Sequence, residues 1–321
     1  VRCIFLPRES IAGHDIGERL GEVLVKDQLA SAEDIEAAAL EQQKLRGQLS
    51  VNAAAVVRYL YGVPVGALIL ALYLLLVGGT LPALNLGFVM LAAAGGLGQI
   101  LGTNLLIMAF GHRGFAVGTA YAKTEAVQGA VLALVLLGER ISALAWVGIA
   151  TGVGGVLWLS LAGKARSLGE VLRATVQPAA LCGLSAGFFF ALTSVLVKAA
   201  NQALPGDDPI LRALVTLVVA NILQTGMQGG WLLAREPDQA RAVFTTWRTS
   251  AQVGALSACG SACWFTAFAL APVALVRAVG QVEIIFTLLF SRFYLKERPS
   301  AAEIIGVCVV VVGVVLVLIG R

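Results

Sequence analysis

Charged residues that could do chemistry lie within apolar stretches of this sequence: Lys123, Glu125, Arg277 and Glu283. At about 1.5 Å of rise per helical residue, Lys123 and Glu125 lie about 14–17 Å along a helix starting near residue 114, close to the middle of a ~30 Å hydrocarbon core. Glu283 lies at the same depth in its own stretch, and Arg277 is shallower. A charge at that depth costs roughly 2.5–3.5 kcal/mol on insertion scales, so such residues are expected to pair and to serve a function.

Lys123 and Glu125 cannot simply neutralise each other, because two residues along a helix turn their side chains about 200° apart. The sequence therefore predicts a pair between two apolar stretches, for instance Lys123 with Glu283. Two uses of such a pair stay open: a polar substrate cavity, or a structural ion pair that fixes two helices. In the first case a carboxylate could carry a coupling proton, and replacing Glu125 and Glu283 by glutamine should abolish transport while expression persists.

Polar and aromatic side chains near these charges could complete a cavity. The candidates for substrate or ion binding are Tyr121, Gln128, Asn104, Gln281 and Trp264, with Gln99, Thr103, Asn221 and Gln224 as further neighbours. Each alone is more often an interhelical hydrogen bond than a ligand. Neither the two histidines nor the five cysteines fall into a catalytic or metal-binding arrangement. No enzyme activity, metal or cofactor is therefore expected.

Membrane helices must position these residues. Of the 321 residues, 58% are hydrophobic and 13% are charged, with a mean hydropathy of +0.86, whereas soluble proteins carry about 25% charge. This composition excludes a soluble enzyme, a disordered chain and a nucleic-acid-binding domain. Nine stretches are long and apolar enough to cross a bilayer as helices: residues 53–77, 83–110, 114–137, 142–162, 178–198, 209–233, 250–271, 272–294 and 301–320.

The distribution of charge predicts an orientation. Residues 1–50 carry 6 Lys/Arg and 9 Asp/Glu, a net charge of −3, and residues 51–321 carry 17 and 10, a net charge of +7. If the acidic N-terminal segment is cytoplasmic, ten positive residues of the connecting loops lie on its side, as the positive-inside rule favours. The sequence thus predicts a multi-pass protein of a bacterial inner membrane with its C-terminus on the opposite side.

The apolar body repeats itself at an offset of 158 residues. Glu125 corresponds to Glu283, and the Glu-Arg pair at 139–140 corresponds to the one at 297–298. Repeated halves with charges at matching membrane positions are typical of secondary transporters. We therefore predict three parts: a soluble helical segment at 1–50, a four-helix repeat at 51–163 and a five-helix repeat at 178–321.

Two copies of one pattern carry a family resemblance. Gly138-Glu139-Arg140 precedes a Gly-rich apolar helix, and Lys296-Glu297-Arg298 precedes another. With them, residues 52–321 resemble the drug/metabolite transporter superfamily, in particular its EamA type. The resemblance implies ten helices in two inverted five-helix repeats around a central substrate cavity, with both chain ends in the cytoplasm. This sequence departs from that pattern, because residues 20–40, where the first helix would fall, are polar.

The N-terminal segment shows a second resemblance. Residues 19–42 are similar to the repeat at the N-terminus of type II secretion ATPases, a class that includes cyclic-di-GMP binders, in Arg19-Leu20-Gly21, Leu29-Ala30-Ser31, Ile35 and Gln42. Ser31, followed three residues later by Asp34, favours a helix start. The second repeat of that family lacks its Arg-Leu-Gly start here, so we expect a small helical appendage rather than a nucleotide-binding module.

Two functional hypotheses remain. The leading one is an inner-membrane secondary transporter or exporter of small, amino-acid-like or drug-like metabolites that works by alternating access, with protons as a candidate coupling ion. The alternative is a transport-inactive regulatory or assembly subunit that binds a partner through its soluble segment. Expected partners are a small-molecule substrate and the lipid bilayer, and no nucleic acid. Small-residue runs permit close packing within the bundle, or a homodimer through the helix at 142–162 or 301–320.

Overall fold

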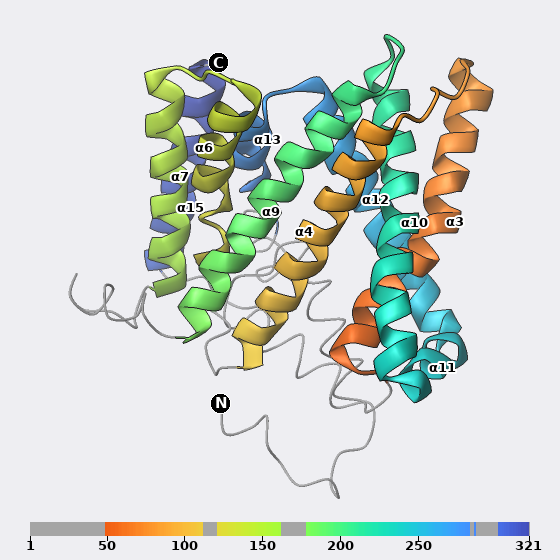
Figure 1. The fold of residues 1–321 in the computed structure, drawn as a ribbon. Helices are drawn as coiled ribbons and strands as arrows, with labels where there is room; N and C mark the ends of the chain where they lie inside the picture. Colours follow the sequence, from red (N-terminus) through yellow and green to blue (C-terminus); the bar gives the residue numbers. More distant parts are fainter. Residues whose placement is uncertain (1–48, 112–120, 162–177, 283–285, 287–300, 321) are drawn as a thin grey trace, which may run out of the picture.

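The computed structural model describes residues 49–111, 121–161, 178–282, 286 and 301–320, and the regular structure of these ranges is all helical (Figure 1). Its helices are α3 (Val51–Val77), α4 (Leu86–Gly111), α6 (Glu125–Leu137), α7 (Ala143–Leu161), α9 (Pro178–Ala203), α10 (Pro209–Arg235), α11 (Pro237–Thr245), α12 (Trp247–Leu270), α13 (Val273–Gly280) and α15 (Ala301–Ile319). The predicted soluble segment at 1–50 lies outside the described residues except for its last two.

Most of these helices are apolar on all sides. Five of them, α3, α4, α9, α10 and α12, are long and apolar enough to cross a membrane, and three shorter helices, in α6, α7 and α15, are also apolar. Each of the nine predicted stretches contains a described helix, so the all-helical membrane class is confirmed. Leu75, Leu76 and Leu86 are 78–83% exposed, as expected where lipid surrounds a helix whose backbone groups are satisfied internally.

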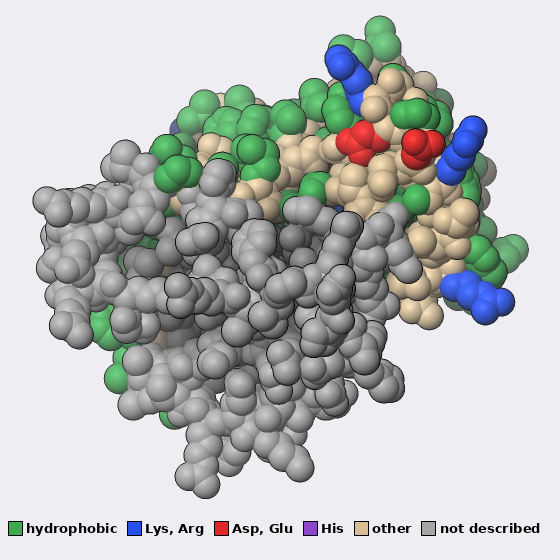
Figure 2. Space-filling model, turned by 90° about the horizontal axis from the view of Figure 1, so that it is seen from below, with side chains coloured by type: hydrophobic (Ala, Val, Ile, Leu, Met, Phe, Trp, Pro, Cys, Tyr) green, Lys and Arg blue, Asp and Glu red, His purple; other side chains and the backbone are tan. Residues whose placement is uncertain are grey.

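The short helix α11 lies at one edge of the bundle, beside the start of α3, whereas α15 ends at the opposite edge (Figure 1). Seen from the edge that carries α11, charged side chains of both signs gather at one end of the described surface (Figure 2). The exposed residues of α11 and its flanks include Arg235, Asp238, Arg241, Phe244, Trp247 and Arg248. Basic and aromatic residues together are typical of the boundary between membrane and water.

Two helix pairs reproduce the 158-residue offset in their bounds. Both ends of α3 and α10 are 158 residues apart, and so are both ends of α7 and α15. α7 and α15 pack antiparallel through glycines: a Cβ on Gly148 would lie 2.7 Å from the Gly313 carbonyl oxygen, and one on Gly155 would lie 3.0 Å from the Gly306 oxygen. The 158-residue offset relates the two contacts, because Gly148 corresponds to Gly306 and Gly155 corresponds to Gly313. Gly148 and Gly155 of α7 and Gly306 and Gly313 of α15 are thus used inside the bundle.

The structure interrupts two helices that the sequence predicts as continuous. The stretch predicted at 114–137 contains a turn at 123–124, after which α6 begins. The stretch predicted at 272–294 contains a turn at 281–282, where α13 has ended. Mean hydropathy does not reveal these breaks, because each stretch as a whole is apolar enough for a continuous helix.

The two breaks have the same hydrogen bond. The Thr124 amide donates to the Tyr121 carbonyl oxygen at 3.2 Å, and the Val282 amide donates to the Val279 oxygen at 3.0 Å. The two donors are 158 residues apart in the sequence, and so are the two acceptors. Bonds that span three residues tighten a helix locally, and such segments in mid-helix often mark a functional position.

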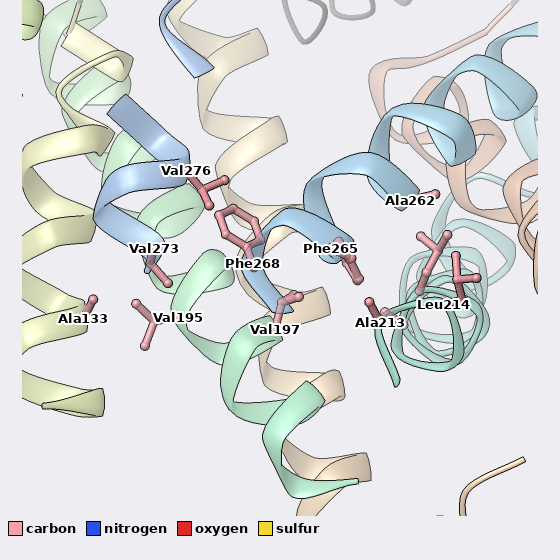
Figure 3. Close-up of a cluster of buried hydrophobic side chains, with 12 residues drawn as sticks. Ala133, Val195, Val197, Ala213, Leu214, Ala262, Phe265, Phe268, Val273 and Val276 are labelled. Carbon is pink, nitrogen blue, oxygen red and sulfur yellow. The ribbon is translucent and has the colours of Figure 1, made fainter. Parts of the chain in front are cut away.

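A buried core joins the helices on the two sides of α9. One cluster takes side chains from five helices, and Figure 3 labels Ala133, Val195, Val197, Ala213, Leu214, Ala262, Phe265, Phe268, Val273 and Val276. Phe268 of α12 and Val276 of α13 lie next to each other in it (Figure 3). α9 contacts both α4 and α6, so its polar side chains can reach either neighbour.

The start of α13 is held by α9 and by the turn that follows α6. Glu139 accepts a hydrogen bond from the Val273 amide (2.8 Å) and forms an ion pair with Lys198 (2.5 Å). Lys198 also donates to the Ala271 carbonyl oxygen at 2.7 Å. Backbone groups that the junction before Pro272 would leave without a helical partner are thereby satisfied. Lys198 is 8% exposed and has a structural role.

Replacing Glu139 by alanine should lower the free energy of unfolding by about 1–3 kcal/mol, because the Val273 amide and the Lys198 ammonium both lose an acceptor. The matched control is Arg140→Ala, since Arg140 is the next residue and is exposed. That change should alter stability by less than about 0.5 kcal/mol. Thermal unfolding in detergent micelles measures both effects, and equal shifts for the two variants would contradict the role given to Glu139.

Candidate functional site

A buried ion pair lies beside the two helix breaks. Arg277 Nη1 donates to Glu125 Oε1 at 3.0 Å, and the two residues are 5% and 8% exposed. The other guanidinium nitrogens donate to α9: Nε to Ser194 Oγ at 2.8 Å, and Nη2 to the Phe190 carbonyl oxygen at 3.1 Å. Each nitrogen of the guanidinium is therefore engaged, as a buried arginine requires. Two predicted site residues from different repeats thus meet.

Aromatic residues of α12 cover the guanidinium. The Arg277 Cζ atom lies 4.9 Å from the ring centroid of Trp264 and 5.4 Å from that of Phe268. The two rings stack with their centroids 5.6 Å apart. A desolvated contact between a cation and a ring is worth about 2 kcal/mol. Gly280 is required at this place, because a Cβ on it would collide with the Trp264 ring.

The breaks place each charge at a favourable helix end. Glu125 is the first residue of α6, and Arg277 lies in the last turn of α13. The N-terminus of a helix carries a partial positive charge and the C-terminus a partial negative charge, so each end stabilises the side chain it holds. Broken helices that present their ends near the middle of the membrane are typical of the binding sites of secondary transporters.

Further predicted residues form the first break itself. Thr124 Oγ1 donates to the carbonyl oxygen of buried Tyr121 at 2.6 Å, and Gln128 Nε2 donates to Thr124 Oγ1 at 2.8 Å. Gly187 of α9 lets this turn come close, because a Cβ there would lie 2.7 Å from the Ala122 carbonyl oxygen. Tyr121 and Gln128 therefore lie one turn on either side of the break.

Two further predicted site residues are directed to helices other than α6 and α13. Gln281 turns toward α7, and Asn104 lies on α4. Gln281 is 5% exposed and faces α7, where a Cβ on Gly152 would lie 2.9 Å from its Oε1. Asn104 lies on α4, and its Oδ1 is buried without a hydrogen-bond partner in the described part of the chain. Neither has a hydrogen bond to the Glu125–Arg277 pair among the described contacts.

The predicted pair of Lys123 with Glu283 is not tested by the structure. Lys123 is half-buried in the turn before Glu125. Glu283 lies outside the described residues. The carboxylate at the first break, that of Glu125, pairs with Arg277, the charge that the sequence places at a shallower depth.

A second polar cluster lies between α4 and α10. Gln224 Nε2 donates to Gln99 Oε1 at 2.8 Å and to the Gly96 carbonyl oxygen at 3.2 Å. One turn further along come Thr103 and Gln228, which are 3% and 5% exposed. The sequence groups Gln99, Thr103 and Gln224 with the buried charges, but Gln99 and Gln224 join two other helices.

Sequence reasoning missed the groups that hold Arg277. Ser194, the Phe190 carbonyl and the Phe268 ring all contact its guanidinium. A serine within an apolar helix is a weak signal, because its hydroxyl can bond to its own helix, as Ser194 Oγ does to the Phe190 oxygen at 2.8 Å.

Comparisons with known proteins bear on this geometry. Residues 177–319 match the model of the EamA-like transporter family, a match to fewer than half of the residues. No curated protein matches. Among solved structures, one titled "Crystal structure of protein" is similar with a TM-score of 0.63 and 16% identity, over 96% of this chain and 99% of that chain. At that identity the likeness concerns the fold alone. The resemblance of residues 19–42 to secretion ATPases finds no support.

Fold and family match together define a class. The chain is an all-helical, multi-pass membrane protein that carries an EamA-like transporter domain at 177–319. The family is one of transporters and not of enzymes. At this coarse level the chain has the features of a membrane transporter of small molecules.

Proposed function

We propose that this chain is a secondary transporter of the bacterial inner membrane for small, amino-acid-like or drug-like metabolites, working by alternating access about the Glu125–Arg277 pair. The observation that carries the proposal is the pair of helix breaks at 123–124 and 281–282, with a buried ion pair beside them. An ion pair that serves only to fix two helices needs no break in either. A helix break leaves backbone groups and helix ends without helical hydrogen-bond partners, so that they can bind a ligand. Secondary transporters build their sites in this way.

We propose proton coupling because the Glu125–Arg277 pair contains a carboxylate that can take up a proton. A proton on Glu125 would remove the negative charge that holds Arg277, and with it the charge-assisted bond between α6 and α13. Loss of the proton restores that bond. Two states of one contact at the junction of the repeats give the bundle two arrangements, which alternating access requires. Glu283, the counterpart of Glu125 at the 158-residue offset, is the second carboxylate we assign to this role.

The groups at the site favour a zwitterionic substrate. An open pair offers a carboxylate to the amine of a substrate and a guanidinium to its carboxylate. The rings of Trp264 and Phe268 lie against Arg277 and suit an apolar or aromatic substituent of the same molecule. Among the proposed substrates, amino-acid-like metabolites combine these three features.

Transport assays in proteoliposomes that contain the purified chain distinguish a loss of proton coupling from a loss of substrate binding. Uptake under an imposed pH gradient is first measured for labelled amino acids, sugars and cationic drugs, which identifies a substrate. Glu125→Gln should then lower gradient-driven uptake of that substrate at least tenfold. It should retain exchange of labelled for unlabelled substrate at high substrate concentration, because exchange needs no net movement of protons and the amide oxygen of glutamine still accepts a hydrogen bond from the substrate amine. Glu283→Gln should behave alike.

The control variant is Asp238→Asn, since Asp238 is an exposed carboxylate on α11. It should transport like the unchanged protein. Normal gradient-driven uptake by Glu125→Gln would refute the proposed role of that carboxylate. Absence of uptake and of exchange across the whole panel, in folded protein, would favour the transport-inactive subunit instead.

A further inference from the structure

One face of α12 is exposed in the described structure. Its residues recur at helical spacing: Gln252, Leu256, Cys259, Gly260 and Cys263. Leu256 is 76% exposed, and both cysteines are free and exposed. A Cβ on Gly260 would meet no atom within 4 Å. The face therefore combines a protruding leucine with an open glycine one turn away.

The 158-residue offset relates α12 to α4, and the inner contacts of these helices agree. A Cβ on Gly96 of α4 would lie 2.9 Å from Gln224 of α10. A Cβ on Gly254, 158 residues later, would lie 2.5 Å from Tyr61 of α3. Because α3 and α10 are themselves 158 residues apart, α4 packs on α10 as α12 packs on α3.

The outer contacts of the two helices differ. Gly102 of α4 is covered by α9, where a Cβ would lie 2.9 Å from the Phe190 ring, whereas its counterpart Gly260 has no such neighbour in the described chain. The counterpart of α9 would be residues 20–45. Those residues include eight with charged side chains, and that charge opposes crossing the hydrocarbon core. α12 thus keeps a helix-packing face that no described helix covers, and the sequence at the corresponding position is too charged for an apolar helix.

We propose that this face is the interface between two copies of this chain. Copies insert with one orientation, so two identical faces meet about a two-fold axis along the membrane normal. An isologous contact needs complementary shapes on one surface, and Leu256 and Gly260 provide them. Small residues at the crossing point let two helix backbones approach closely. Cys259 and Cys263 flank that point, so these thiols lie near the axis.

The native thiols test this in membranes that contain the full chain. With Cys3, Cys182 and Cys308 replaced by serine, oxidation by a membrane-permeant copper complex should give a disulfide-linked dimer on a non-reducing gel. The matched control keeps Cys308 as its single cysteine, because that thiol is exposed on α15. It should give at least tenfold less dimer. Gly260→Trp in the first background should remove the dimer and, since its site is open, leave the thermal stability of the monomer unchanged.

Four results would overturn the proposal. Equal crosslinking of the Cys308 control would indicate random collision, and a dimer that persists with Gly260→Trp would indicate another face. No dimer, with both thiols reactive toward a lipid-soluble maleimide, would mean that lipid covers the face. No dimer, with both thiols protected, would mean that the N-terminal segment or a different protein occupies it.

Discussion

Replacing Arg277 by methionine is expected to lower the free energy of unfolding by about 3–5 kcal/mol. The carboxylate of Glu125 stays in a buried site after its guanidinium partner has gone, and removing one partner of a buried ion pair is strongly destabilising. The same change removes the donors to Ser194 Oγ and to the Phe190 carbonyl oxygen. It also removes the cation from the Trp264 ring. Thermal unfolding of the purified protein in micelles measures the loss.

Two further variants make this prediction specific. Combining Glu125→Gln with Arg277→Met should recover most of the lost stability, because no charge of the pair then remains buried. Arg248→Met is the matched control, since Arg248 also lies over a ring, 5.6 Å from the Trp247 centroid, but is exposed. It should cost about 0.5–1 kcal/mol. A double variant no more stable than Arg277→Met would show that the two side chains are not coupled.

Gly313→Ala is the second change with a large expected effect. The added Cβ would collide with the backbone nitrogen of Gly152 on α7. Neither backbone can give way as a flexible side chain would, so α15 must move away from α7 along the whole contact. Overpacking of this kind costs about 1–3 kcal/mol. The expected result is a lower unfolding temperature and a smaller fraction of monodisperse protein in size-exclusion chromatography.

Gly154→Ala is the control, and its expected effect on stability has the opposite sign. Gly154 lies on α7, and a Cβ there would meet no atom within 4 Å. Since alanine favours the helix over glycine by about 1 kcal/mol, this variant should be as stable as the unchanged protein or more so. Destabilisation of both variants by the same amount would mean that the close contact of α7 with α15 does not explain the effect.

The sequence by itself determined the class of this protein and the positions of its helices. Composition and stretch length require membrane helices, because hydrocarbon satisfies no backbone group. The offset of 158 residues anticipates the matching bounds of α3 with α10 and of α7 with α15. The cost of burying a charge likewise singles out Glu125 and Arg277 among the residues of the apolar stretches.

Tertiary structure alone decided which charges meet. Helices that are apolar all round carry little information about the direction in which each side faces. Nothing in the sequence therefore shows that Glu125 meets Arg277, and the pair of Lys123 with Glu283 stays a prediction. The rotation of α6 and α13, set by the breaks at 123–124 and 281–282 and by packing against α9, brings Glu125 and Arg277 together. Those breaks depend on local hydrogen bonds and on close contacts such as that of Gly187 with the Ala122 oxygen, which hydropathy cannot detect.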